Sequence, residues 1–77
     1  MNTRRRKALE EISERIEELV AEVEELRDEE QEAFDNTPES LQYTERGEAM
    51  QTAIDNLDSL SSSLEDANSC IEDIING

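Results

Sequence analysis

The chain has 77 residues, with 22 acidic and 7 basic side chains, no His and one Cys, which gives a formal charge of −15. A chain this short buries too little surface to form a deep pocket alone, and without His it lacks the side chain most used for acid–base chemistry and metal binding. These features argue against an enzyme and predict neither a cofactor nor a metal site, and the lack of any long apolar run predicts a soluble, cytoplasmic protein with no membrane partner.

The first predicted helix covers about residues 4–35. Apolar residues recur in it at alternating steps of three and four, which is typical of a coiled-coil seam. They are Leu9, Ile12, Ile16, Leu19, Val23, Leu26 and Ala33. The basic cluster "RRRK" at residues 4–7 is expected to be a frayed, solubilising end, or to pair with Glu72 and Asp73.

A bend at residues 36–43 interrupts the helical pattern. Thr37 and Pro38 resemble a helix N-cap followed by proline at the first helical position, and a short turn of helix is expected over residues 39–42. Thr44 is then expected to cap the next helix. Because apolar residues near a turn usually pack, three bend residues are expected to form a hydrophobic plug: Phe34, Leu41 and Tyr43. As the alternative, the exposed tip is a contact surface with Glu39, Tyr43 and Arg46.

The second predicted helix covers about residues 44–75. The same apolar pattern resumes there at Met50, Ala53, Leu57, Leu60, Leu64, Ala67, Ile71 and Ile74. Its middle, "DSLSSSLEDANS", is rich in Ser, Asp and Asn, which compete for backbone hydrogen bonds and lower the intrinsic helix propensity. This helix is therefore expected to depend on packing against a neighbour.

Folding the chain back about Leu41 and Gln42 sets the two seams opposite each other, for example Ile12 with Ile71 and Leu26 with Leu57. The sequence thus predicts an all-α single domain, residues 1–77, that forms an antiparallel two-helix coiled-coil hairpin. A domain-swapped dimer with straightened chains would use the same heptads, so the pattern leaves open whether the helices pair within or between chains.

Four further apolar residues lie one position beyond the predicted seam and widen each apolar stripe. They are Val20, Phe34, Ile54 and Ile75. Because an isolated helical pair of this size is marginally stable, the wider stripe predicts a homodimer that forms a four-helix bundle, or docking on another protein.

The acidic residues suggest a second kind of surface. Either they only keep the protein soluble, or they imitate nucleic acid, because carboxylates along a rigid rod of ~45 Å resemble a row of phosphates. The second interpretation predicts a protein partner with a basic surface and no direct binding of nucleic acid. The residues predicted to meet that partner are Glu14, Glu18, Glu22, Glu25, Glu29, Asp55, Asp58, Glu65 and Asp66.

The start "RRRKALEEI" and the stretch "DEEQEAFDNTPESLQYTERGEAMQTAIDNLDSL" resemble a group of short acidic helical-hairpin proteins encoded by bacteriophages and prophages. In that group, as here, a Glu-rich helix leads into an "EAFDN.PESLQ" bend and then an "ERGE.M..AIDNL" helix. The resemblance covers nearly the whole chain and carries over no activity and no functional residue. It implies a phage context in the cytoplasm of a bacterial host, where small proteins of this kind often block restriction or CRISPR effectors.

The leading functional hypothesis is a non-enzymatic acidic protein that inhibits or modulates a host or defence nucleic-acid-binding protein by occupying its basic surface. The alternative is a structural or assembly module that acts through its hydrophobic stripe, with the charge only keeping it soluble. Polar substitutions in the stripe and charge reversals on the acidic face discriminate between the two.

Overall fold

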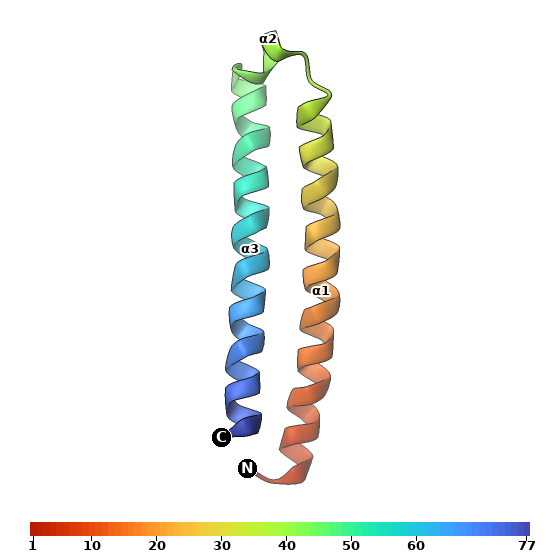
Figure 1. The fold of residues 1–77 in the computed structure, drawn as a ribbon, viewed down its shortest axis with the longest axis vertical. Coiled ribbons are helices and arrows are strands. Elements are labelled where there is room, and N and C mark those ends of the chain that lie inside the picture. The colour runs from red at the N-terminus through yellow and green to blue at the C-terminus, as the bar shows by residue number, and fades with distance from the viewer.

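The computed structural model describes residues 1–77 and contains three helices. Helix α1 spans Thr3–Asp35, the single-turn helix α2 spans Glu39–Gln42, and α3 spans Glu45–Asn76. The long helices α1 and α3 run antiparallel, with α2 at the tip and both chain ends at the opposite end (Figure 1). The predicted helical hairpin is therefore confirmed, and the two helices pair within one chain.

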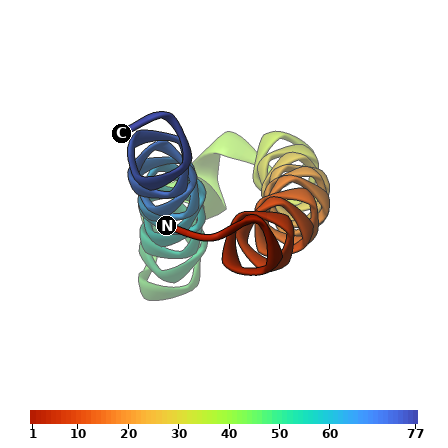
Figure 2. The ribbon, with the colours of Figure 1, turned by 90° about the horizontal axis from the view of Figure 1, so that it is seen from below.

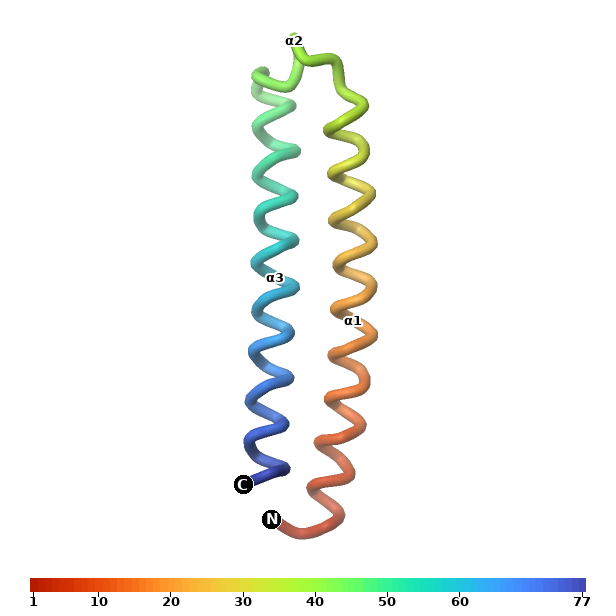
Figure 3. The backbone as a smooth tube through the Cα atoms, viewed as in Figure 1, coloured from red at the N-terminus to blue at the C-terminus, as the bar shows by residue number.

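The hairpin is a rod with a single layer of two helices. Its principal extents are 58 × 15 × 13 Å. The end-on view shows α1 and α3 side by side with no third long element over them (Figure 2), and the backbone trace shows both running nearly the full length of the rod (Figure 3). Each helix consequently keeps one side against its partner and the rest of its circumference free.

Side chains cap the beginning of both long helices. The Asn2 side chain accepts a hydrogen bond from the Arg5 backbone N–H (2.9 Å), and the predicted cap Thr44 accepts one from the Gly47 N–H (3.5 Å). These caps satisfy N–H groups that have no partner inside the helix. The basic residues 4–7 therefore lie at the capped beginning of α1, in helical conformation.

The expected pairing of that basic cluster with Glu72 and Asp73 does not occur. Arg27 makes the only ion pairs in the molecule, with Asp28 (3.6 Å) and Asp58 (3.0 Å). The cluster therefore remains a separate positive patch at the open end of an otherwise acidic rod.

Polar groups close the bend between α1 and α3. The Gln42 side-chain amide donates to the backbone carbonyls of Phe34 (3.3 Å) and Thr37 (3.1 Å), and the Thr37 hydroxyl donates to the Ala33 carbonyl (2.9 Å). These contacts satisfy carbonyls at the end of α1 that have no helical N–H partner. Gln42 thus ties α2 to the end of α1.

The predicted hydrophobic plug does not form at the tip. Tyr43 is 80% exposed and Leu41 is 50% exposed, while only Phe34 is partly buried. The tip is closed by backbone contact instead, because Gln42 packs directly on the buried Gly47. This close contact, together with the Gln42 hydrogen bonds, leaves no interior space for the side chains of Leu41 and Tyr43.

Each long helix has three rows of residues in or beside the seam, and each row repeats every seven residues. The inner row is buried or partly buried: Ser13, Val20, Arg27 and Phe34 on α1, and Gly47, Ile54, Ser61, Asn68 and Ile75 on α3. The shared row is also buried or partly buried: Leu9, Ile16, Val23 and Glu30 on α1, and Met50, Leu57, Leu64 and Ile71 on α3. The outer row is mostly exposed: Ile12, Leu19, Leu26 and Ala33 on α1, and Ala53, Leu60, Ala67 and Ile74 on α3.

The seam is rotated relative to the one predicted from the sequence. Inner and shared rows form it, whereas the apolar periodicity favoured the shared and outer rows. The register along the rod is close to the prediction: Ser13 hydrogen-bonds Asn68 and Arg27 meets Asp58, each within two residues of the predicted level. The rotation arises because these polar pairs and the contact at Gly47 set which sides of the helices approach each other, and apolar spacing contains no information about them.

Candidate functional site

The rotation of the seam leaves a row of large apolar side chains in solvent. The exposed fractions are 37% for Ile12, 46% for Leu19, 54% for Leu26, 47% for Leu60 and 46% for Ile74. By contrast, only two hydrophobic side chains in the whole molecule are buried, Ile54 (1% exposed) and Ile71 (7% exposed). More large apolar side chains are thus exposed along these two helices than are buried between them.

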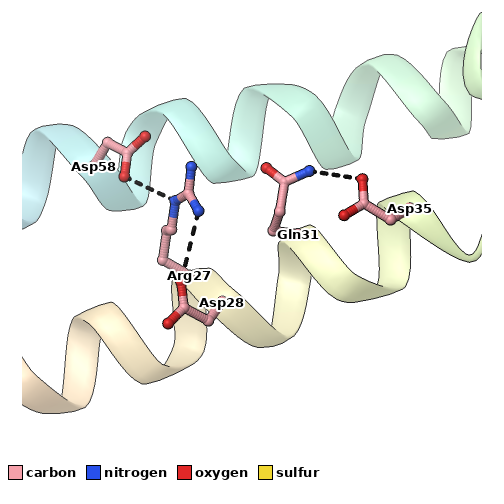
Figure 4. Close-up of polar contacts among 5 residues, drawn as sticks. All are labelled: Arg27, Asp28, Gln31, Asp35 and Asp58. Carbon is pink, nitrogen blue, oxygen red and sulfur yellow. Dashed lines mark hydrogen bonds and ion pairs between the residues drawn. The ribbon is translucent and has the colours of Figure 1, made fainter.

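The outer rows of α1 and α3 lie on the same side of the rod. The inner-row residue Arg27 crosses from α1 to α3, where its Nε donates to Asp58 Oδ1 at 3.0 Å (Figure 4). Asp58 is four residues after Ile54, so it lies just past the inner row on the side away from the outer row. The inner-row sides of both helices therefore face the same way, and both outer rows face the opposite way.

We call this surface the apolar face, defined by the outer row together with the half-buried edges of the shared row. An open hollow on its α1 side is lined by Leu19, Glu22, Val23, Glu25, Leu26 and Glu29. Three of its six lining residues, Leu19, Val23 and Leu26, are apolar, so it offers an open surface on which apolar side chains of a partner can pack.

The two borders of the apolar face carry different charges. The border on α3, three residues beyond each outer-row position, contains Ala49, Asn56, Ser63 and Cys70 and has no charge. The matching border on α1 contains Ala8, Arg15, Glu22 and Glu29. The outer rows and the α3 border thus contain no carboxylate, although 22 residues of the chain are acidic and three of them, Glu22, Glu25 and Glu29, line the hollow on the α1 side.

All nine acidic residues predicted to meet a partner are exposed. They do not form one flat band. Glu22 and Glu29 border the apolar face, Glu18 and Glu25 lie on the side of α1 away from α3, and Asp58 is held by Arg27. The structure therefore distributes the predicted acidic site around the outside of the rod.

The four residues predicted to face an oligomer or partner lie in the seam between α1 and α3. Ile54 is the most deeply buried side chain of the protein, and Val20, Phe34 and Ile75 are partly buried. The hydrophobic stripe available to a partner is instead the outer row. Its heptad repeat is visible in the sequence, but the alternating steps of three and four place the same repeat in the predicted seam.

The bend-tip residues Glu39, Tyr43 and Arg46 are all exposed. Exposure is what the alternative prediction, in which the tip is a contact surface, requires. No hydrogen bond or ion pair holds the side chains of Tyr43 or Arg46. They therefore add an aromatic group and a cation to the closed end of the rod.

Two other kinds of site are absent from the structure. Acidic side chains and Cys70 nowhere gather into a group of three that could hold a metal ion. Neither long helix contains a stretch with the length and hydropathy that crossing a membrane requires.

No family model matches the chain, and no curated protein or solved structure shows significant similarity to it. The resemblance to phage-encoded acidic hairpins therefore remains a prediction.

Proposed function

We propose that the protein is a non-enzymatic acidic binding protein that occupies the basic surface of a nucleic-acid-binding protein, and that it does so as a dimer in the form of a four-helix bundle. In this proposal it is a phage-encoded inhibitor of a host or defence protein and acts in the bacterial cytoplasm. The observation that supports this function is a rod 58 Å long whose carboxylates are exposed and almost entirely unpaired.

The charge arrangement favours a basic partner for a physical reason. Only Asp28 and Asp58 take part in ion pairs, so 20 of the 22 acidic side chains have no cation beside them. A rod with this excess of negative charge attracts a basic groove over distances of about one screening length, ~8 Å at physiological salt. Binding that relies on this attraction weakens steeply as salt is added.

A second function is supported by a different observation. The apolar face has five large side chains that are 37–54% exposed, which is the usual mark of a protein-binding surface. In this alternative the chain is an assembly module, and its contact with the partner is hydrophobic. Such a complex survives high salt.

The two functions separate in a pull-down from bacterial lysate at low and at high salt, with bound proteins identified by mass spectrometry. A captured nucleic-acid-binding protein that is lost at high salt and displaced by DNA supports the acidic inhibitor. A captured partner that persists at high salt supports the assembly module.

Charge reversal on α1 then tests which acids contribute. The variant carries Lys at Glu14, Glu18 and Glu25, and a matched control carries Lys at Glu10, Glu17 and Glu24, which gives the same net charge on another side of the helix. The first variant is expected to lose about tenfold or more in affinity and part of its salt dependence, with a smaller loss in the control. Equal losses would show that only net charge matters, and unchanged binding would refute the electrostatic mechanism.

A further inference from the structure

The apolar face is the largest feature of the structure that the contacts within one chain do not explain. Its large residues repeat every seven positions along both helices: Ile12, Leu19 and Leu26 on α1, and Leu60 and Ile74 on α3. A protein of 77 residues with two buried hydrophobic side chains has very little core. The apolar face therefore has the composition of a core surface, and no other part of the chain covers it.

We propose that a second copy of this chain covers the apolar face. The two hairpins pack with these faces together through an isologous two-fold contact and form a four-helix bundle in which the outer rows of both chains become the central core. This inference builds on the dimer of the proposed function and identifies its surface. That surface is the outer row, and it differs from the four residues indicated by the sequence.

The area of the face agrees with a stable dimer. The outline of one side of the rod is about 870 Å², from its 58 Å length and 15 Å width, which is an upper limit on the footprint of the apolar face, and a standard-sized interface takes ~800 Å² per partner. The side of the rod is therefore large enough to contain a standard-sized interface when two hairpins pack along their length.

The distribution of charge also favours a second copy. Each chain carries −15, so two copies are expected to meet through the surface with the fewest carboxylates. The outer rows and the α3 border contain none, and most acids of α1 lie on the sides facing away from the apolar face; the exceptions are Glu22, Glu25 and Glu29, which line the hollow. In the resulting bundle most acidic residues of both chains remain outside, where they can still reach a basic partner.

The shape of the face matches its own side chains. The hollow is lined by Leu19, Val23 and Leu26 together with three glutamates, and Leu19, Glu22, Val23 and Leu26 have the spacing of the four-residue hole into which coiled-coil helices insert a single apolar side chain. The outer row of a second copy supplies leucine and isoleucine at the same seven-residue spacing. A face that presents both the sockets and the side chains that fill them is self-complementary.

Sedimentation equilibrium of the purified protein, without any target, tests the proposal. The wild-type chain is expected to sediment at twice the 8.8 kDa of one chain. The double variant Leu19→Gln with Leu60→Gln is expected to weaken dimerisation by at least about a hundredfold. The matched control, Ala21→Gln with Ser62→Gln, places the same side chains on the exposed side of each helix away from the face and is expected to remain dimeric.

A second measurement identifies the surface even if the variant unfolds. In a dimer mixed from ¹³C-labelled and unlabelled wild-type chains, nuclear Overhauser effects between chains are expected at methyl groups of the outer row, such as those of Leu19 and Leu60. A helical wild-type monomer at all concentrations would overturn the proposal. So would contacts between chains confined to methyl groups outside the apolar face.

The outcome is independent of the acidic-inhibitor function. Charge reversal at Glu14, Glu18 and Glu25 is expected to leave the sedimenting mass unchanged while it weakens target binding. A dimer that binds no basic protein would therefore refute the inhibition of a basic partner and leave the self-association intact. A monomer that binds one would refute the self-association, and with it the dimeric form of the proposed function, and leave the inhibition intact.

Discussion

Gly47 is the residue that determines how tightly the chain turns. A Cβ atom built on it would lie 2.7 Å from the Cα of Gln42 and closer still to that residue's carbonyl group. Gly47 does not have a positive φ, so glycine is needed here because it lacks a side chain and not because of an unusual backbone conformation. The backbone of α2 can therefore pack directly on the first turn of α3.

Replacing Gly47 by Ala is expected to destabilise the protein by about 1–3 kcal/mol, because the backbone of α2 must move to admit the methyl group. This sign is opposite to the usual one, since Gly→Ala inside a helix normally stabilises by roughly 0.5–1 kcal/mol. Thermal unfolding followed by circular dichroism measures the change. The control Ser62→Ala, at an exposed position of α3, is expected to be neutral or slightly stabilising, and a stabilised Gly47→Ala variant would contradict the close contact.

Ser13 and Asn68 form a polar pair inside the seam, where their side chains hydrogen-bond across the two helices. A polar pair at an inner-row position fixes the register of two helices at some cost in stability. Combining Ser13→Ala with Asn68→Leu is therefore expected to stabilise the hairpin by about 1 kcal/mol, because it buries apolar surface and leaves no donor without an acceptor.

Urea denaturation of the double variant and of both single variants measures this effect. Ser13→Ala alone is expected to be mildly destabilising, since the Asn68 side chain then loses its partner. A double variant less stable than the wild type would show that the pair contributes more stability than an apolar layer of similar size.

At the scale of the helices, the sequence predicts the extent of each long helix better than which side of the helix faces its partner. Alternating steps of three and four predict both long helices, and Thr44 caps α3 as predicted. The short helix over residues 39–42 also forms, but Thr37 does not cap it, because Pro38 precedes its first residue and the Thr37 hydroxyl donates to the Ala33 carbonyl. The rotation of the seam was not predictable, because the outer and inner rows both follow the heptad and share one row between them. Polar contacts such as that of Arg27 with Asp58 distinguish the two, and they appear only once the helices are paired.

Because the rotation of the seam is not predictable from the sequence, only part of the candidate site is predictable. Exposure of the acidic residues follows from their chemistry, so all nine predicted acids lie on the surface. The exposure of Leu19 or Leu60 does not follow from the chemistry of leucine, because a leucine in a heptad pattern is normally expected in the seam. Without the rotation, the outer row cannot be identified as the surface available to a partner.

The two long helices are expected to differ in intrinsic stability. Helix α1 is rich in Glu, Leu, Ala and Arg, whereas the middle of α3 is rich in Ser, Asp and Asn. In synthetic peptides of residues 3–35 and 45–76, circular dichroism is expected to show about twofold more helix in the first. Mixing the two peptides should then raise the helical signal above the sum, and equal helicity of the separate peptides would contradict the dependence of α3 on packing.

At the scale of the whole molecule, charge opposes folding. The chain has 22 acidic and 7 basic residues and only two ion pairs, both made by Arg27, so folding brings many carboxylates together without compensating cations. Helix dipoles add to this cost at the open end of the rod, because the basic residues 4–7 lie at the beginning of α1 and Glu72 and Asp73 lie near the end of α3, whereas Glu45 and Glu48 in the first turn of α3 are favourably placed. The surface charge is therefore expected to lower the stability of the hairpin.

Added NaCl is therefore expected to raise the melting temperature. The screening length falls from ~30 Å at 0.01 M to ~3 Å at 1 M, which removes most of the repulsion between exposed carboxylates. A gain of about 1 kcal/mol corresponds to roughly 4–8 °C for a domain of this size, and calorimetry or circular dichroism at a fixed protein concentration measures it.

A variant with Gln at Glu10, Glu17 and Glu24 has a charge of −12 instead of −15, so it should start from a higher melting temperature and gain less from salt. A melting temperature that falls with NaCl would mean that ion pairs stabilise the fold more than carboxylate repulsion destabilises it, which the two contacts of Arg27 give no reason to expect.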